Sequence, residues 1–195
     1  MKKIIIALLV LLLMVVFDYA GDYDNYKVKK QEDIQKTLTF TGSARQKTLK
    51  IDNIFGFIDL IGYNGKDIKL TAQKTIKAES EETARNAQKD VKLDIKQEGD
   101  HIEIIVDGPF RKEDGKINWK DELGYKVQYD FELKVPHHTN LDLKTVLKSY
   151  IKVRDIKGSI DLGNVNGEIE AINIDGDFNV KTVNGKVIIA GITGS

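Results

Sequence analysis

Residues 149–194 read SYIKVRDIKGSIDLGNVNGEIEAINIDGDFNVKTVNGKVIIAGITG and repeat one pattern every nine residues. Each unit is centred on a glycine, which Ser149 replaces in the first unit. An apolar residue lies two positions before this glycine, and further apolar residues lie two and four positions after it. Because strand side chains point alternately to opposite faces, each unit predicts a short strand with one buried face. The glycines that set this period are Gly158, Gly167, Gly176, Gly185 and Gly194.

The strict period predicts how these units are arranged. Asn-Gly and Asp-Gly pairs such as 166–167 and 175–176 are turn dipeptides, so a series of antiparallel hairpins is one alternative. Hairpins do not need identical spacing, whereas stacked units do, and two units would form one 18-residue coil. The same unit occurs at residues 54–60, around Gly56. We therefore predict an all-β, single-stranded parallel β-helix (β-solenoid) with nonapeptide repeats over residues 45–195.

Three other segments of this domain have distinct patterns. Residues 125–135 alternate apolar and polar side chains throughout and predict a half-buried strand. Residues 80–91 predict a short inserted helix, with a capping Ser80, acidic residues in the first turn and alanines on one side. Residues 108–124 predict a long loop or hairpin. Its Phe110 and Trp119 are candidate contacts for a sugar or a protein, or else cover the edge of the core.

The first twenty residues, MKKIIIALLVLLLMVVFDYA, predict an export signal. Two lysines precede an apolar stretch at residues 4–17, which is shorter than the ~20 residues needed to span a bilayer. Ala20 suits cleavage, but Asp18 would then occupy a position that prefers a small neutral residue, so an uncleaved N-terminal anchor is the alternative. We expect a periplasmic, cell-surface or secreted protein, with residues 21–44 as a leading segment. Membrane contact is expected only through an uncleaved N-terminus.

Composition and motifs exclude several classes of function. Thirty Lys and Arg balance thirty Asp and Glu, which argues against a nucleic-acid partner, and the lack of cysteine excludes disulfides and thiol chemistry. Asp175 and Asp177 supply too few oxygens for the calcium site of glycine-rich repeats. His137 and His138 would point to opposite faces of a strand and cannot readily share a metal ion. The sequence contains no recognised catalytic motif, so we expect no catalytic residue, cofactor or metal site.

Residues 135–145, VPHHTNLDLKT, and the repeats that follow resemble the bacterial putative-adhesin family of unknown function, a group of β-strand-repeat proteins. The resemblance covers about residues 45–195. It implies an exported, envelope-associated, right-handed β-helix with no established enzyme activity, and it supplies no catalytic residues to transfer. The chain stops inside a repeat at Gly194-Ser195, so we expect either a truncated stack or one that continues.

The sequence thus favours a non-enzymatic envelope or cell-surface protein, a rigid scaffold for binding or adhesion. The expected partner is another envelope protein or a glycan. One alternative is a polysaccharide-binding or polysaccharide-cleaving β-helix protein that uses Trp119 and the charged face of the repeats. Another is a fragment of a larger surface protein whose function depends on further repeats.

Overall fold

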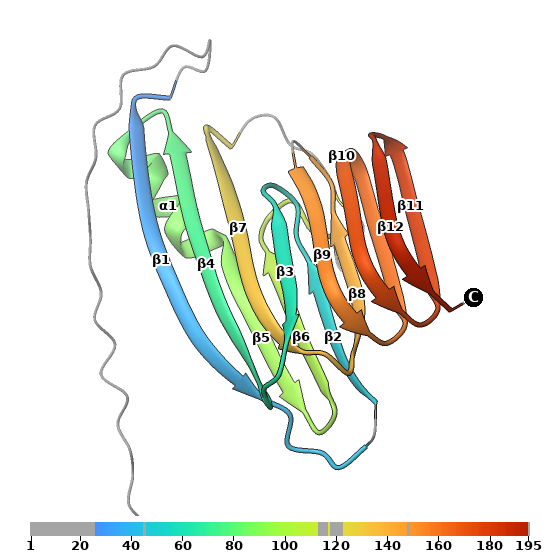
Figure 1. The fold of residues 1–195 in the computed structure, drawn as a ribbon. Helices are drawn as coiled ribbons and strands as arrows, with labels where there is room; N and C mark the ends of the chain where they lie inside the picture. Colours follow the sequence, from blue (N-terminus) through green and yellow to red (C-terminus); the bar gives the residue numbers. More distant parts are fainter. Residues whose placement is uncertain (1–25, 45, 113–116, 118–122, 148, 195) are drawn as a thin grey trace, which may run out of the picture.

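The computed structural model describes residues 26–44, 46–112, 117, 123–147 and 149–194, and this part of the chain forms twelve strands and one helix (Figure 1). The predicted export signal and Trp119 lie outside the described residues. The elements, in chain order, are β1 Val28–Thr39, β2 Lys47–Asp52, β3 Ile58–Tyr63, β4 Asp67–Ala78, α1 Glu81–Asp90, β5 Lys92–Glu98, β6 His101–Asp107, β7 Tyr125–Pro136, β8 Thr139–Thr145, β9 Ser149–Lys157, β10 Ile160–Asp175, β11 Phe178–Asn184 and β12 Val187–Thr193.

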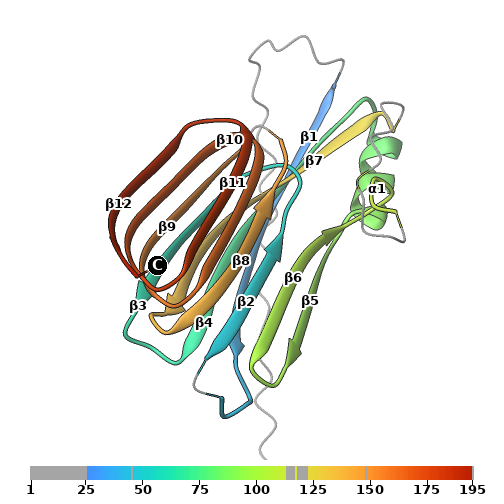
Figure 2. The ribbon, with the colours of Figure 1, turned by 90° about the vertical axis from the view of Figure 1, so that its right-hand side faces the viewer.

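The strands form one continuous sheet in the order β1-β4-β7-β3-β9-β10-β8-β2-β6-β5, with β11 and β12 also paired to β10. The long strand β10 connects two facing layers, because its first half pairs with β8 and β11 and its second half with β9 and β12. Layer A contains β1, β4, β7, β3, β9, the second half of β10 and β12. Layer B contains β5, β6, β2, β8, the first half of β10 and β11. Figure 2 shows the two layers facing each other.

The two ends of the sheet approach each other, so the fold is nearly closed and barrel-like. The backbone N–H of Thr39 donates to the Gln97 side chain at 3.2 Å, and the N–H of Thr41 donates to the Gly99 carbonyl at 2.9 Å. These bonds connect the end of β1 with the β5–β6 turn. Residues 26–44 thus include a strand that is part of the sheet.

The prediction of a single parallel β-helix is wrong. Three strand pairs in the described chain are antiparallel, namely β1–β4, β4–β7 and β5–β6. The physical reason is that β1, β4 and β7 run for twelve residues each without any of the glycines that set the nine-residue period, so they do not turn from one layer to the other as β10 does. The fold is an all-β mixed sheet with one helix. The repeat unit at residues 54–60 does not extend the nine-residue period into this half of the chain.

Strands in the C-terminal part are parallel, and most are related by 18 residues. Ile169 of β10 pairs with Ile151 of β9 on one side and Val187 of β12 on the other. Ile160 pairs with Phe178 of β11. The antiparallel hairpins considered as an alternative for this segment are therefore not formed. Equivalent side chains of every second unit therefore lie side by side, and successive units lie in opposite layers.

The apolar faces of the two layers form the core. The strand predicted at 125–135 is confirmed as β7, in which alternate side chains are buried. Each fully buried aliphatic side chain contributes about 1.5–3 kcal/mol relative to exposure, so this row of residues supplies much of the stability. The fully buried side chains include Leu49, Ile51, Ile58, Leu60, Ile102, Ile104, Phe131, Leu143, Ile151, Leu162 and Ile169.

The helix α1 covers one end of the core, as Figure 2 shows. The Ser80 hydroxyl accepts a hydrogen bond from the Thr83 N–H at 3.1 Å, and this cap starts the helix at the predicted place. Ala84 and Ala87 are buried. The buried Lys74 donates from Nζ to the Val91 carbonyl at the helix end at 2.6 Å, and burial lowers its pKa. No helix among the described residues is long and apolar enough to cross a bilayer.

Candidate functional site

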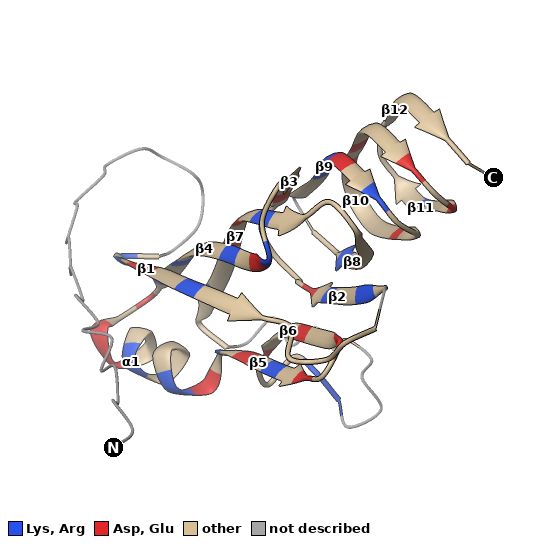
Figure 3. Ribbon diagram, turned by 60° about the horizontal axis from the view of Figure 1, so that its bottom comes forward, with Lys and Arg blue, Asp and Glu red and all other residues tan. Residues whose placement is uncertain are grey.

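Charged residues of both signs are mixed along the strands of both layers (Figure 3), and among the described residues only the charged side chain of Lys74 is buried. This alternation is expected, since the outward half of each strand is in water. A charged residue on the outer face of a layer is therefore a functional candidate only if its contacts differ from those of an ordinary solvated ion pair. We compared three places: the outer face of layer B, a groove at the bends of the C-terminal strands, and the outer face of layer A.

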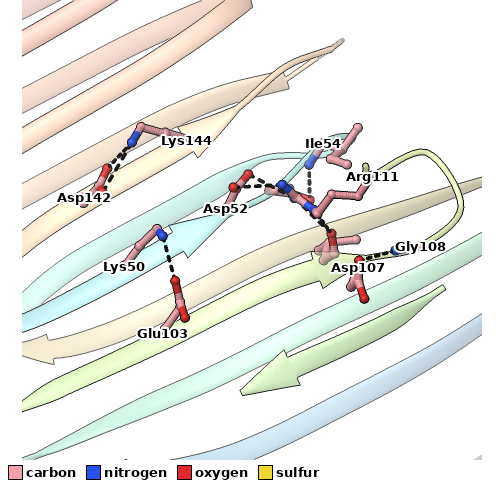
Figure 4. A network of polar contacts seen from close by, with 11 residues as sticks. Lys50, Asp52, Ile54, Glu103, Asp107, Gly108, Arg111, Asp142 and Lys144 are labelled. Atoms are coloured by element: carbon pink, nitrogen blue, oxygen red, sulfur yellow. Dashed lines mark hydrogen bonds and ion pairs between the residues drawn. The ribbon is translucent and has the colours of Figure 1, made fainter. Parts of the chain in front are cut away.

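The outer face of layer B carries a network of paired charges (Figure 4). Lys50 of β2 and Glu103 of β6 are 2.7 Å apart; this hydrogen bond raises the pKa of Lys50 and lowers that of Glu103. Arg111 makes a bidentate contact with Asp52 at 3.0 and 3.1 Å. Arg111 also donates to the Val106 carbonyl, so it fastens the segment after β6 to the sheet. The charges of Lys50, Asp52, Glu103 and Arg111 thus have partners within the protein, which indicates a structural role.

A groove of about 490 Å³ follows the bends of the C-terminal strands. Here Asp155 and Asn173 have positive φ angles of 59° and 56°, and they stand 18 residues apart. The Asn173 amide donates to the Asp155 carboxylate at 3.0 Å, and the Asp155 carbonyl contacts His137 Nδ1 at 2.7 Å. Thr193 donates to the Asp175 carboxylate at 3.2 Å. These polar groups bond one another and hold the bends in place.

The outer face of layer A has a different feature, an aromatic pair on the surface. The register that pairs Ile58 with Ile151 places Phe57 beside Tyr150. The two rings are stacked, with centroids 4.8 Å apart and planes inclined by 3°. The Tyr150 side chain is among the few large apolar or aromatic groups of the described chain that are exposed, at 37%. Aromatic stacking of this kind adds about 0.5–1.5 kcal/mol beyond burial, so the pair is a fixed platform.

Ion pairs and a shallow groove surround this platform. Arg154 contacts Asp59 at 2.7 Å and Lys152 contacts Glu170 at 3.0 Å. Glu168 is the register partner of Tyr150 on the neighbouring strand β10. Burial raises the pKa of the Tyr150 hydroxyl, and the charge of Asp59 adds to this effect. The groove measures about 350 Å³ and is lined by Ser149, Tyr150, Ile151, Lys152, Glu168 and Glu170.

Of the two residues singled out from the sequence as ligand contacts, only Phe110 is among the described residues, and it does not help to build this surface. Phe110 is 8% exposed and belongs to the hydrophobic core. Trp119 lies outside the described residues, so its role stays a prediction. Sequence reasoning missed Phe57 and Tyr150. Their signal was an aromatic residue at an outward position of an alternating strand, where a polar residue is usual.

The turn glycines act in two ways. Gly56, Gly176 and Gly194 have φ angles of 105°, 149° and 127°, which favour glycine. At Gly167 and Gly185 the reason is space, because a Cβ would collide with the backbone of the residue 18 positions earlier. Gly158 is restricted in the same way, since its Cβ would lie 2.8 Å from the Thr139 carbonyl oxygen. These glycines permit close stacking and do not form a ligand site.

Among the described residues, no group of three or more His, Asp or Glu side chains is arranged to hold a metal ion. His137 and His138 do not converge on such a site. The larger groove at the bends and the smaller one beside Tyr150 thus have to be judged as binding surfaces. Of these two grooves, only the one beside Tyr150 combines an exposed aromatic ring with the carboxylate of Glu168, which has no ion-pair partner among the described residues.

No protein-family model matches the chain, and no curated protein matches it. Among solved structures, the chain is similar to a putative cell adhesion protein from Clostridium sporogenes, with 11% identity and a TM-score of 0.45; the match covers 83% of this chain and 99% of that one. It is also similar to a putative adhesin from Parabacteroides distasonis, with 13% identity and a TM-score of 0.33, over 86% of this chain and 67% of the other. Neither likeness is strong enough to support an assignment of function.

Proposed function

We propose that this is an exported protein that works without catalysis at the cell surface, as a rigid scaffold whose outer layer A face binds a partner. The observation that carries the proposal is the stacked pair of Phe57 and Tyr150 on that face. Large aromatic groups are enriched at the centres of binding surfaces and are otherwise mostly buried. A pair held on an outward, otherwise charged sheet face is best explained by contact with a partner.

Rigidity supports this proposal. The residues that alternate with the platform, Ile58 and Ile151, are fully buried, and their strands are paired on both sides. The rings therefore keep their positions before a partner arrives. Binding by such a surface loses little conformational entropy, which raises affinity for a given area of contact.

The N-terminal sequence supports export. Lys2 and Lys3 followed by the apolar residues 4–17 have the form of a secretory signal. Fractionation of the producing cells, with N-terminal sequencing of the recovered protein, tests this part. We expect the protein outside the cytoplasm, beginning after Ala20 if the signal is cleaved and at the N-terminus if it is retained. Recovery from the cytoplasmic fraction alone would reject the proposal.

The binding role is tested with the purified protein and isolated cell-envelope material. Phe57→Ala combined with Tyr150→Ala is expected to weaken binding at least about fivefold, the loss typical of removing central aromatic contacts. Lys134→Ala on the same face, in β7, is the matched control and should change binding less than about twofold. Equal binding by the double variant would contradict the assignment of the site.

Polysaccharide binding is the second candidate, because an exposed aromatic ring such as Tyr150 can stack on a sugar. A glycan array separates it from a protein partner: binding to defined neutral glycans that is lost on Tyr150→Ala would favour the polysaccharide. Release of new reducing or unsaturated ends from a glycan, abolished by a single substitution, would show catalysis and reject the non-enzymatic proposal.

A further inference from the structure

We propose that the groove beside Tyr150 receives a basic side chain, lysine or arginine, from a partner protein. This inference rests on the proposed function, since it specifies the chemistry of the partner that docks on the same face of layer A. The name Tyr150 groove is used below for the space lined by Ser149, Tyr150, Ile151, Lys152, Glu168 and Glu170.

The strand order determines which ring face is available. Strand β9, which carries Tyr150, lies between β3 and β10. Phe57, just before β3, stacks on one face of the Tyr150 ring. The other face therefore turns toward β10, where Glu168 is the register partner of Tyr150. The groove thus has an aromatic wall on one side and a carboxylate on the other.

This combination fits a cation. A lysine or arginine head group within ~6 Å of an aromatic centroid is attracted by the ring, and neighbouring paired strands are ~4.8 Å apart. A cation beside the Tyr150 ring is then also within reach of the Glu168 carboxylate. Arginine suits the site best, because its planar group stacks on the ring and hydrogen bonds to the carboxylate at the same time.

The charges around the groove favour the same ligand. The cations that flank it are already used, since Lys152 pairs with Glu170 and Arg154 pairs with Asp59. Glu168 forms no ion pair with any described residue. Lys186 lies opposite it, because the register that pairs Ile169 of β10 with Val187 of β12 also brings these two residues together. Lys186 is therefore the competitor within the chain that a partner would displace. Burial is the main cause that raises the pKa of Tyr150, and the nearby charges of Asp59, Asp130 and Glu132 add to it, as a negative potential would.

A neutral sugar fits less well. Sugar hydroxyls need both donors and acceptors placed around an aromatic ring, and the ammonium group of Lys152 is engaged by Glu170. Of the remaining polar side chains that line the groove, the Ser149 hydroxyl donates to the Asn164 side chain at 3.4 Å and the Glu168 carboxylate is an acceptor only. Leaving such a carboxylate desolvated without a cation would cost binding energy.

The test uses the protein as isolated after export and two short acetylated and amidated peptides. One contains a single arginine among glycine and serine, and the other contains citrulline in its place, which removes the charge and keeps the shape. In an NMR titration we expect the arginine peptide to shift the Tyr150 ring signals and to bind about tenfold more tightly than the citrulline peptide, in line with a cation–π contact plus an ion pair.

Variants assign this preference to the groove. Tyr150→Ala and Glu168→Gln should each weaken binding of the arginine peptide about fivefold or more. Asp33→Asn, on strand β1 of the same layer and four strands from β9, should change it less than about twofold. Lys186→Gln should leave binding unchanged or strengthen it. Equal binding of the two peptides, or unchanged binding by Tyr150→Ala, would overturn the inference.

The same set of measurements separates this inference from the proposed function. If Tyr150→Ala lowers binding to envelope material while the arginine and citrulline peptides bind equally, the face binds a partner that is not basic. If displacement by a neutral oligosaccharide accompanies this, the partner is a glycan. If Tyr150→Ala changes neither envelope nor peptide binding, both proposals fail.

Discussion

Gly185 lies directly against Gly167, the equivalent residue 18 positions earlier, so closely that a Cβ added at Gly185 would collide with the Gly167 carbonyl oxygen. Gly167 has the same relationship to Ser149. Neighbouring backbones meet at these places without room for any side chain. The nine-residue glycine period in the sequence is therefore a requirement of close packing.

Gly167→Ala should destabilise the protein by about 2 kcal/mol or more, because the methyl group meets fixed backbone atoms. Urea unfolding measures the change. Gly163→Ala is the matched control in the same strand: its Cβ would lie 3.4 Å from a flexible Lys144 side chain, and we expect a change within about 0.5 kcal/mol. Equal effects of the two substitutions would contradict the packing explanation.

Asn53→Ala should destabilise the protein by about 2–4 kcal/mol, because it leaves buried backbone groups without partners. The fully buried Asn53 amide donates to the carbonyls of Tyr129 and Gly56 at 2.9 and 3.2 Å. Thermal or urea unfolding gives the change. Asn179→Ala removes an exposed contact with Asp161 and should cost less than about 0.5 kcal/mol. A loss at Asn53 no larger than at Asn179 would refute the prediction.

Stability should fall in alkaline solution as the buried tyrosines ionise in the unfolded chain. Burial, together with the charge of Asp90, raises the pKa of Tyr125 from 10.0 to about 12, and burial raises that of Tyr129 as well. The unfolded chain then binds fewer protons than the folded chain above pH 10, so the unfolding free energy falls from there to about pH 12. Below pH 10 this contribution is complete.

Tyr125→Phe checks this assignment. Urea unfolding as a function of pH should show a shallower alkaline loss in the variant than in the native chain. Lys74 acts in the opposite direction, because burial lowers its pKa from 10.5. Between this lowered pKa and pH 10.5 the unfolded chain binds more protons than the folded chain, so the unfolding free energy rises with pH there. A parallel alkaline decline in the variant would assign the effect to other groups.

Deletion of 18 residues should be tolerated where deletion of nine is not. Removal of residues 159–176 joins Gly158 to Asp177, so that β11 and β12 take the register of the two halves of β10. We expect a cooperative unfolding transition with reduced stability. Removal of nine residues, 168–176, would instead place β11, a strand of layer B, in layer A, and β12, a strand of layer A, in layer B. We expect this deletion to abolish the cooperative transition. Far-UV circular dichroism during heating distinguishes the two outcomes.

Local features of the fold follow from the sequence. The alternation over residues 125–135 defines β7, and the capping Ser80 with two following glutamates places α1. Both signals are local, since side-chain alternation and the needs of the first helical turn act within a few residues. The spacing of the C-terminal units likewise follows from the glycine period, including the 18-residue offset between strands.

Strand neighbours and direction in the N-terminal half do not follow from the sequence. Alternation in β1 and β4 shows that each has a buried face, but it is equally compatible with parallel and antiparallel partners. One match to the repeat around Gly56 was not enough to extend the period there. The platform was missed for the same reason, because Phe57 and Tyr150 lie far apart in the chain and meet only through the pairing of β3 with β9.

The helix α1 closes one end of the core, while equivalent contacts recur every 18 residues toward β12. An in-frame duplication of 18 codons within this region would reproduce the same burial, the same glycine contacts and the same outward row of side chains. Such an insertion leaves the closed end untouched. The C-terminal part of the molecule can therefore vary in length during evolution, and each added segment would carry its own copy of an outward-facing surface on which selection could act.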